Sequence, residues 1–231
     1  MNQLEVIPIS ANFRLQLSPK EAAMYSPEVA FSVNKIWEKG TSLTDWDLFD
    51  GKVFQLDELH EDYLTGVFSN YRYFYAQNKQ PELKNDLNMI LVGVAGILQC
   101  EDKYLLGKRS DKVTQFPLMW EFAPSGGISI DYLSGETIEY EKQLFEELTE
   151  EVGMEWDFVT EVRPFLLILD KEQMSLDICA HLSVDPIGKA IATYDSPEYV
   201  AYEWLPKDQI AQFLKGKDVV PMTHALCKNI S

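Results

Sequence analysis

The sequence predicts an α/β or α+β protein in two parts: a small N-terminal α/β domain over residues 1–85 and a larger domain over residues 86–231. Two observations support this prediction. Apolar segments with strand-like alternation occur among segments that carry helix start and stop signals. A polar stretch from Gln77 to Asp86, interrupted by Pro81, separates two apolar regions and marks the expected boundary.

In the first part, one helix has clear end signals. Ser26 suits the N-cap and Pro27 the first helical position, so a helix is expected to run from there to about Trp37 and to end at Gly40. The strands expected in this part lie at 13–17, 52–56 and 63–68.

In the second part, the segment 117–127 is rich in Gly, Pro and aromatic residues and is expected to be a loop. A helix over 137–152 is predicted with Thr137 as N-cap and Gly153 as its stop. The other helices expected lie at 207–214 and 222–228, and the strands at 89–99, 103–108, 162–169, 175–184 and 198–204.

The charge balance excludes some partners. The chain has 20 Lys and Arg against 37 Asp and Glu, a net charge of −17. Because phosphate surfaces are held by Lys and Arg, we expect no nucleic-acid partner and no anionic membrane surface. No apolar run reaches the ~18 residues that would span a bilayer. An acidic protein can still bind a phosphorylated small molecule when a divalent cation lies between the two anions.

The cysteines and the N-terminus indicate a cytoplasmic location. Cys100, Cys179 and Cys227 are far apart and form no CxxC motif, so neither a disulfide framework nor a zinc site is expected. The chain begins without a basic region followed by an apolar run, so no secretory signal is expected. The sequence predicts no particular oligomeric state.

The densest functional signal is the acidic run Glu146 to Glu151 followed by Val152, Gly153 and Met154. On an α-helix, Glu147, Glu150 and Glu151 would share one narrow face. Like charges at these spacings repel, and clustered carboxylates suit Mg²⁺ or Mn²⁺. The simpler interpretation is that this is a solvated helix face, which is common in so acidic a chain.

The surrounding residues favour a functional role, because the run resembles the Nudix box, G-x5-E-x7-R-E-U-x-E-E-x-G-U with U aliphatic. Residues 147–154 match its second half at every position. Gly127 and Glu136 match the first half in type, but eight residues separate them where the family has five. Nine residues then precede Glu146, where the family has seven, and Glu146 replaces the family arginine that orients the glutamates.

Flanking segments extend the resemblance over residues 88–220. The segment from Tyr104 to Arg109 resembles the family's second strand, and Leu118 to Gly127 resembles its Trp-x-x-Pro-Gly-Gly approach. Glu203 to Pro206 resembles the strand and helix start near the end of the fold. The resemblance implies a Nudix α/β/α sandwich that hydrolyses a nucleoside-diphosphate-linked small molecule with Mg²⁺ or, alternatively, Mn²⁺.

The N-terminal part resembles the atypical UDP-glucose/UDP-galactose diphosphatase branch, which also has an extra N-terminal domain and a stretched box. The matching segments are 36–38, 48–56 and 71–74. They are short and mostly apolar, so each is also explained by ordinary core packing. This branch implies a UDP-sugar substrate that is cleaved to UMP and a sugar 1-phosphate.

The resemblance also implies residue roles. The metal ligands would be Glu147, Glu150 and Glu151, with the carbonyl of Gly127 as a further ligand. Glu147 or Glu151 would be the catalytic base, and Glu203 is a weaker candidate. The substrate-binding candidates are Arg72, Lys108, Arg109, Phe122, Gly126 and Gly127, with Trp120 and Tyr71 as further stacking candidates. Surface Lys and Arg are often only solvated, and each aromatic residue is equally well explained as core.

Two alternatives stay open at this point. One is a different substrate for the same fold, such as ADP-ribose, another nucleotide sugar or a dinucleotide. The other is a non-catalytic Nudix-fold binding module, which Glu146 and the altered spacing would favour. The three histidines are isolated in the sequence and none is expected to be catalytic: His60, His181 and His224.

Overall fold

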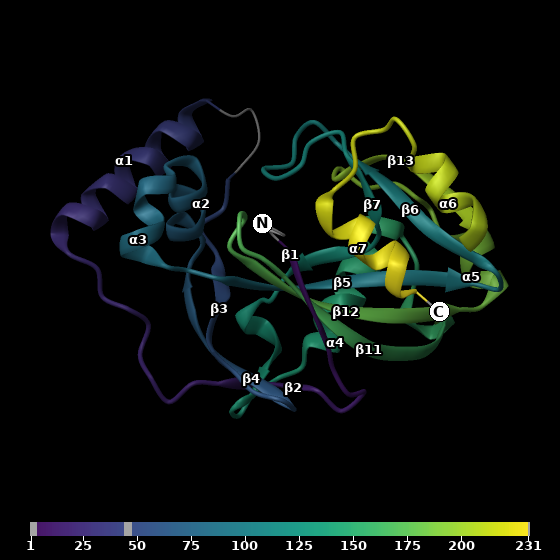
Figure 1. Ribbon diagram of the computed structural model, residues 1–231, viewed down its shortest axis with the longest axis horizontal. Coiled ribbons are helices and arrows are strands. Elements are labelled where there is room, and N and C mark those ends of the chain that lie inside the picture. Colours follow the sequence, from purple (N-terminus) through teal and green to yellow (C-terminus); the bar gives the residue numbers. More distant parts are fainter. Residues whose placement is uncertain (1–3, 44–47, 231) are drawn as a thin grey trace.

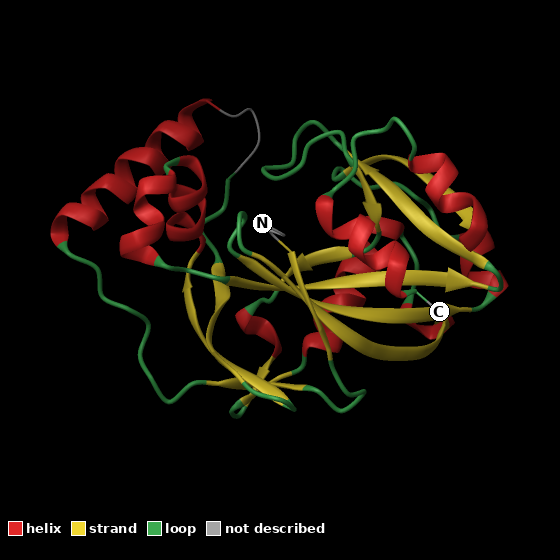
Figure 2. Ribbon diagram, viewed as in Figure 1, coloured by secondary structure: helices red, strands yellow, loops and turns green. Residues whose placement is uncertain are grey.

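A computed structural model describes residues 4–43 and 48–230, which form one mixed sheet of thirteen strands flanked by helices (Figure 2). The fold class is therefore mixed α/β, as predicted. The strands are β1 (Leu4–Pro8), β2 (Arg14–Leu17), β3 (Lys52–Leu59), β4 (Tyr63–Asn70), β5 (Leu91–Cys100), β6 (Lys103–Arg109), β7 (Trp120–Phe122), β8 (Ser125–Gly127), β9 (Leu133–Ser134), β10 (Thr137–Ile138), β11 (Val159–Asp170), β12 (Ser175–Val184) and β13 (Tyr199–Pro206).

The helices fall into separate groups around this sheet. Figure 1 shows α1, α2 and α3 together at one side of the molecule and α6 and α7 toward the other, with β5 extending between them. The α-helices are α1 (Pro27–Leu43), α2 (Tyr71–Lys79), α3 (Lys84–Leu87), α4 (Tyr140–Glu147), α5 (Pro186–Ile191), α6 (Lys207–Leu214) and α7 (Pro221–Asn229). The short 3₁₀ segments are η1 (Pro81–Leu83), η2 (Ile130–Tyr132) and η4 (Trp156–Phe158), and η3 (Leu148–Val152) is a π turn.

The central strand β5 separates two cores. It pairs in parallel with β12 and antiparallel with β8, and nearly all its residues are buried, as expected where both faces are covered. Because side chains alternate across a strand, Val92 and Val94 join the core beneath α4, whereas Ala95 and Ile97 join the core beneath α6 and α7. This arrangement places a helical layer on each face.

The N-terminal segment shares this sheet. β1 pairs along its whole length with β11, and β3 contacts β5 through the single pair Gln55–Leu91. Helices α1 to α3 have a small core of their own, which contains Val33, Ala76 and Leu83. A division into domains at residues 85 and 86 stays a prediction, and its first part includes residues 1–3 and 44–47, which lie outside the described residues.

The polar stretch from Gln77 to Asp86 is mostly helical and is not an extended linker. It contains the end of α2, then η1 and α3. The side chain of Gln77 is fully buried. Its amide donates to the Met89 carbonyl at 2.5 Å and accepts from the Met89 N–H at 3.1 Å. A polar residue in this stretch therefore anchors the chain where it enters β5.

Helix α1 starts as predicted but does not end at Gly40. Ser26 Oγ accepts from the Val29 N–H at 3.3 Å, and the helix continues to Leu43. A Cβ atom at Gly40 would lie 2.5 Å from the Tyr75 hydroxyl. Glycine is thus required at this position by the close approach of α2, and it does not act as a helix stop.

The helix predicted over 137–152 is shorter and changes its winding. Thr137 belongs to β10, because it pairs with Gln16 of β2 and is therefore unavailable as an N-cap. Helix α4 begins at Tyr140, and its last turn widens into η3. Gly153 ends it as predicted, with φ at +67°. The segment 117–127, expected as a loop, contains β7 and β8, which pair with β6 and β5.

None of the described helices is long and apolar enough to cross a membrane.

Candidate active site

Glu147 and Glu151 lie where α4 passes into the π turn η3. Leu148 and Val152 of this turn are fully buried in the core beneath α4. Packing of these two side chains therefore fixes the turn against the sheet. Wider π turns are frequent at functional sites.

Glu151 is a buried carboxylate, with 1% of its surface exposed. Its Oε2 atom accepts from the Ser125 N–H of β8 at 2.8 Å. Its Oε1 atom is buried and accepts no hydrogen bond from any described residue. A buried carboxylate oxygen without a partner is costly unless a ligand or cation completes it.

Glu147 is held by Gln143, one helical turn earlier. Gln143 Nε2 donates to Glu147 Oε1 at 2.8 Å and to Glu146 Oε2 at 3.0 Å. Gln143 Oε1 accepts from the Ser129 N–H at 2.8 Å. Glu146 stands where the Nudix pattern has its arginine, and in this chain the buried Gln143 orients the adjacent glutamates. Gln143 precedes Glu147 by four residues, a spacing that brings two side chains together on a helix. This spacing is the feature of the sequence that could have indicated Gln143.

Gly126 makes room for Glu147. A Cβ atom at Gly126 would lie 1.9 Å from Glu147 Oε1, whereas one at Gly127 would meet no atom within 4 Å. Both glycines belong to β8 and line the cavity beside Glu147. The first glycine of the pair is therefore required by the glutamate it faces.

The two buried glutamates have strongly perturbed acidity. Burial raises the pKa of Glu147 to about 8 and outweighs the hydrogen bond from Gln143, which lowers it; the Glu198 carboxylate adds a smaller rise. Burial also raises the pKa of Glu151 well above its usual range, and the charge of Glu147 adds to it. Both shifts come first from burial and then from neighbouring carboxylates.

Glu150 lies in the π turn, where the i→i+5 bonding changes the angular spacing that an α-helix would give. Its charge is still close enough to help raise the pKa of Glu147. Glu150 is exposed and does not line the cavity. Burial, Glu146 and Glu198 raise its pKa.

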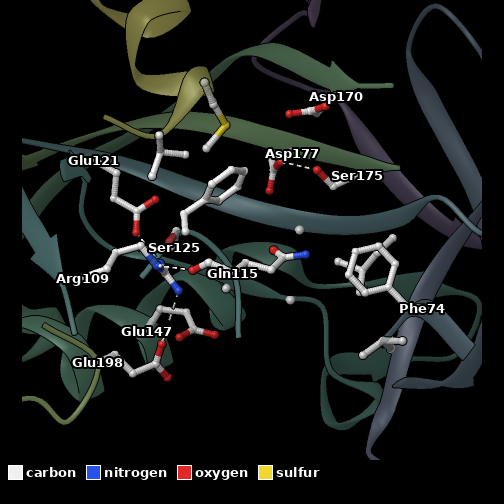
Figure 3. A pocket seen from close by; sticks show the side chains of 18 of the residues that line it. Phe74, Arg109, Gln115, Glu121, Ser125, Glu147, Asp170, Ser175, Asp177 and Glu198 are labelled. Atoms are coloured by element: carbon white, nitrogen blue, oxygen red, sulfur yellow. Dashed lines mark hydrogen bonds and ion pairs between the residues drawn. The ribbon is translucent and has the colours of Figure 1, made fainter. Parts of the chain in front are cut away.

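A cavity of about 540 Å³ extends from Glu147 to the N-terminal segment. Figure 3 shows Glu147 and Glu198 near Arg109 at one end, Phe74 at the other, and Gln115 between them. Among the described lining residues Arg109 is the one cationic side chain, against the carboxylates of Glu121, Glu147, Asp170, Asp177 and Glu198. Such a cavity cannot hold a diphosphate without additional positive charge.

Arg109 is fixed by the neighbouring strands. Its Nη1 atom forms an ion pair with the buried Glu121, which also accepts from the Tyr199 hydroxyl at 2.7 Å. Its Nε atom donates to the Gln115 carbonyl at 3.2 Å, and its Nη2 atom lies 3.9 Å from Glu198 Oε2. Neither Glu121 nor Glu198 stands at a defined position of a motif in the sequence, so their positions along the chain do not predict that they lie near the acidic run.

Several predicted substrate contacts lie outside the cavity. Arg72 pairs with Asp50 and donates to Asn34 Oδ1 at 3.1 Å, so it holds the turn before β3 against α2. Phe122 is 2% exposed and belongs to the core beneath α6 and α7. Lys108 is not a lining residue, because it precedes Arg109 on β6 and neighbouring side chains of a strand point to opposite faces.

The remaining candidates divide in the same way. Tyr71 lines the cavity, while Trp120 packs edge-on against Phe213 in the core. Glu203 is exposed and does not line the cavity. The three histidines also lie outside it: His60, His181 and His224.

No three His, Cys, Asp or Glu side chains within residues 4–43 and 48–230 are arranged so that they could together hold a metal ion. The structure thus presents Glu147 and Glu151 as a pair, with Glu198 facing them from the segment before β13.

No protein-family model and no curated protein matches the sequence. Among solved structures, DR0079 from Deinococcus radiodurans is 22% identical, with a TM-score of 0.47 over 60% of this chain and 81% of that one. Tm1382, a putative Nudix hydrolase, is 12% identical, with a TM-score of 0.47 over 85% and 96%. An ADP-ribose pyrophosphatase from Streptococcus suis is 19% identical, with a TM-score of 0.39 over 60% and 89%. These likenesses are distant, and the function proposed for this chain rests on its own residues.

Proposed function

We propose that this protein hydrolyses the diphosphate linkage of a nucleoside-diphosphate-linked small molecule with the help of Mg²⁺. One observation carries the proposal. The segment that resembles the second half of the Nudix box places Glu147 at a cavity and buries Glu151 beside Ser125, which also lines it. The same cavity contains Arg109, a fixed cation suited to phosphate oxygens.

The donor set at this end of the cavity fits a hard divalent cation. Glu151 Oε1 is buried without a partner, and Glu147 lies among carboxylates that raise its pKa. Glu147 and Glu151 would hold the ion, and Mg²⁺ or Mn²⁺ suits such oxygen ligands. When bound, the ion would neutralise the diphosphate and make an attacking water molecule more acidic.

The chain's own residues supply the remaining functions. Arg109, held by Glu121, would grip phosphate oxygens in a fixed orientation. Gln143 orients Glu147 so that one of its oxygens can accept the proton of the attacking water. A base works best with a pKa near the operating pH, and burial moves the pKa of Glu147 toward that range.

The substrate we propose is a UDP-sugar. Addition of water across the diphosphate bridge of UDP-glucose would give UMP and glucose 1-phosphate. The support is the resemblance of the N-terminal part to the UDP-glucose/UDP-galactose diphosphatase branch, together with the contribution of Gly51, Val53 and Tyr71 from that part to the cavity. ADP-ribose and other nucleotides are the competing substrates. A cytoplasmic location belongs to the same proposal, in keeping with three free cysteines.

A second candidate is a non-catalytic nucleotide-binding module. It is favoured by the absence of a three-ligand metal arrangement among the described residues and by Glu146 at the position of the box arginine.

A substrate panel with product identification separates these functions. We expect UDP-glucose to be cleaved to UMP and glucose 1-phosphate in Mg²⁺ and to stay intact in EDTA. Faster hydrolysis of ADP-ribose than of any UDP-sugar would reject the UDP-sugar as the substrate. It would leave the proposed diphosphate hydrolysis intact. If calorimetry shows that UDP binds but no diphosphate in the panel is cleaved in Mg²⁺ or Mn²⁺, the binding module is correct.

A further inference from the structure

The part of the cavity away from Glu147 contains polar groups that the proposed reaction does not use. The side-chain amide of Gln115 has no hydrogen-bond partner among the described residues, and Figure 3 shows it projecting into the cavity toward Phe74. Asp177 of β12 also lines this part. Its Oδ2 atom accepts from the Ser175 hydroxyl at a long 3.5 Å. Both side chains therefore keep hydrogen-bonding capacity for a ligand.

The backbone that carries Gln115 is fixed from two sides. Its carbonyl accepts from Arg109 Nε at 3.2 Å. The preceding residue, Thr114, shares a hydrogen bond of 3.1 Å between its hydroxyl and that of Tyr71 in α2. The loop between β6 and β7 is thereby tied both to the arginine of the catalytic end and to the N-terminal segment. A side chain on so constrained a backbone is preorganised for binding.

Asp177 is enclosed by protein but open to the cavity. A Cβ atom at Gly93 would lie 2.7 Å from its Oδ1 atom, so the carboxylate sits directly over the bare backbone of β5. Burial raises its pKa to about 7, and the carboxylates of Glu121 and Asp170 add to the rise. An enclosed carboxylate facing a cavity is complementary to a ligand group that donates N–H bonds.

Aromatic side chains of the N-terminal segment form the facing wall. Phe74 and Tyr71 of α2 line the cavity with their ring centroids 6.0 Å apart, and Phe49 lines it with 82% of its surface exposed. Flat apolar rings of this kind stack on heteroaromatic rings. Phe74 lies at the opposite end of the cavity from Glu147 and Arg109 (Figure 3).

We propose that this half of the cavity is the nucleobase subsite, and that Gln115 and Asp177 determine base recognition. The proposal rests on the proposed function, because it takes the diphosphate to lie at the Arg109 end. An amide can pair with a neighbouring N–H and C=O on the edge of a base, and a carboxylate accepts a further N–H. The exposed ring of Phe49 and the ring of Tyr71 offer stacking surfaces for the base, while Phe74, only 2% exposed, packs against Tyr71. The N-terminal segment thus contributes directly to substrate choice.

Binding calorimetry with monophosphates tests the subsite, since UMP and AMP have no diphosphate bond to cleave. In Mg²⁺ we expect the tighter of the two to bind at least about 10-fold more strongly than ribose 5-phosphate, the base-free control. Gln115→Leu should weaken nucleotide binding by about 3- to 10-fold and leave ribose 5-phosphate unchanged. Asp177→Asn should show the same selective loss. Gln209→Leu, on the exposed face of α6, is the matched control and should change neither affinity.

Equal affinities of the wild type for ribose 5-phosphate and both nucleotides would overturn the subsite, and no variant is needed for that result. An unchanged nucleotide preference in both Gln115→Leu and Asp177→Asn would overturn the assignment of these residues. The outcome is separable from the hydrolase proposal. Nucleotide binding that depends on Gln115 in a protein that cleaves no diphosphate keeps the subsite and rejects the hydrolase. Diphosphate cleavage without any base preference keeps the hydrolase and rejects the subsite.

Discussion

The two ends of the cavity are built in different ways. The Glu147 end comes largely from one stretch of chain, in which β8 provides Gly126, the end of α4 provides Glu147 and the π turn η3 provides Glu151. The other end combines α2, the loop between β6 and β7, and β12, whose residues are far apart in the sequence. A local motif can therefore be recognised from sequence, whereas an assembled surface depends on the pairing of β5 with β12 and on the docking of α2.

The two ends also differ in charge. Glu147, Glu151 and Glu198 gather near Arg109, and their mutual repulsion adds to the pKa shifts of the buried pair. At the other end, Asp177 and Asp170 line the cavity together with aromatic rings and the amide of Gln115. We therefore expect substitutions at the first end to affect chemistry and metal binding, and substitutions at the second to affect ligand choice and the pH dependence of stability.

The largest effect is expected for Glu147→Gln and Glu151→Gln. Each should lower the turnover of a diphosphate substrate by about 10²–10⁴-fold, because a carboxylate that accepts the proton is lost. Glutamine is nearly isosteric and an equally good helix former, so the fold should persist. Glu139→Gln, where an exposed residue pairs with Lys142, is the control and should change little. Near-normal turnover in Glu147→Gln would show that the chemistry occurs elsewhere.

A pair of glycine substitutions tests the geometry of the first end. Gly126→Ala places a methyl group against Glu147 Oε1 and should lower turnover by about 10²-fold, since an ångström-scale displacement of a catalytic group has this effect. Gly127→Ala adds the same methyl group to the next residue, in open space, and should cost no more than a few-fold. Equal losses of turnover in the two variants, measured by steady-state kinetics, would contradict the close approach of Gly126 and Glu147.

A smaller, pH-dependent effect is expected at the second end. The pKa of Asp177 is raised in the folded state to about 7, so the folded protein binds this proton more tightly than the unfolded chain does. Its contribution to stability therefore falls as pH rises from about 4 to 7. Asp177→Asn cannot ionise and should gain stability relative to the wild type, by at most about 4 kcal/mol above pH 7. Denaturant unfolding of both proteins at pH 5 and pH 8 measures this difference in stability. If the stability advantage of Asp177→Asn does not grow with pH, the raised pKa of Asp177 is ruled out.

Segments with strong local patterns could be predicted closely. The strand 175–184 and the helix 207–214 were predicted with the bounds that the structure shows, since their apolar spacing and end signals agree. By contrast, Leu4–Pro8 has little strand signal of its own and forms β1 through long-range pairing with β11. The π turn of Leu148–Val152 could not be foreseen either, because α and π windings share the same residue preferences over so short a segment.

The site residues also divide into those that a local motif indicates and those that only the fold brings to the cavity. The glutamates and Gly126 were visible in the sequence because the motif is continuous around them. Arg72 and Arg109 looked alike in sequence, yet Arg72 pairs with Asp50 near α2 and Arg109 reaches the cavity from β6. Only the strand pairing distinguishes them. Glu198 and Asp177 carried no motif, and their placement at the cavity follows from the fold.

The most direct test of the central claim is the change in melting temperature that Mg²⁺ causes in the wild type and in Glu147→Gln. An ion that binds only the native state at about 100 times its Kd stabilises it by about 2.7 kcal/mol, which is roughly 5–10 °C for a chain of this size. We predict this shift for the wild type and less than half of it for the variant. In EDTA the variant should melt at the same temperature or slightly higher, because one buried carboxyl no longer ionises. Identical Mg²⁺-induced shifts in the two proteins would contradict a cation site at Glu147 and Glu151.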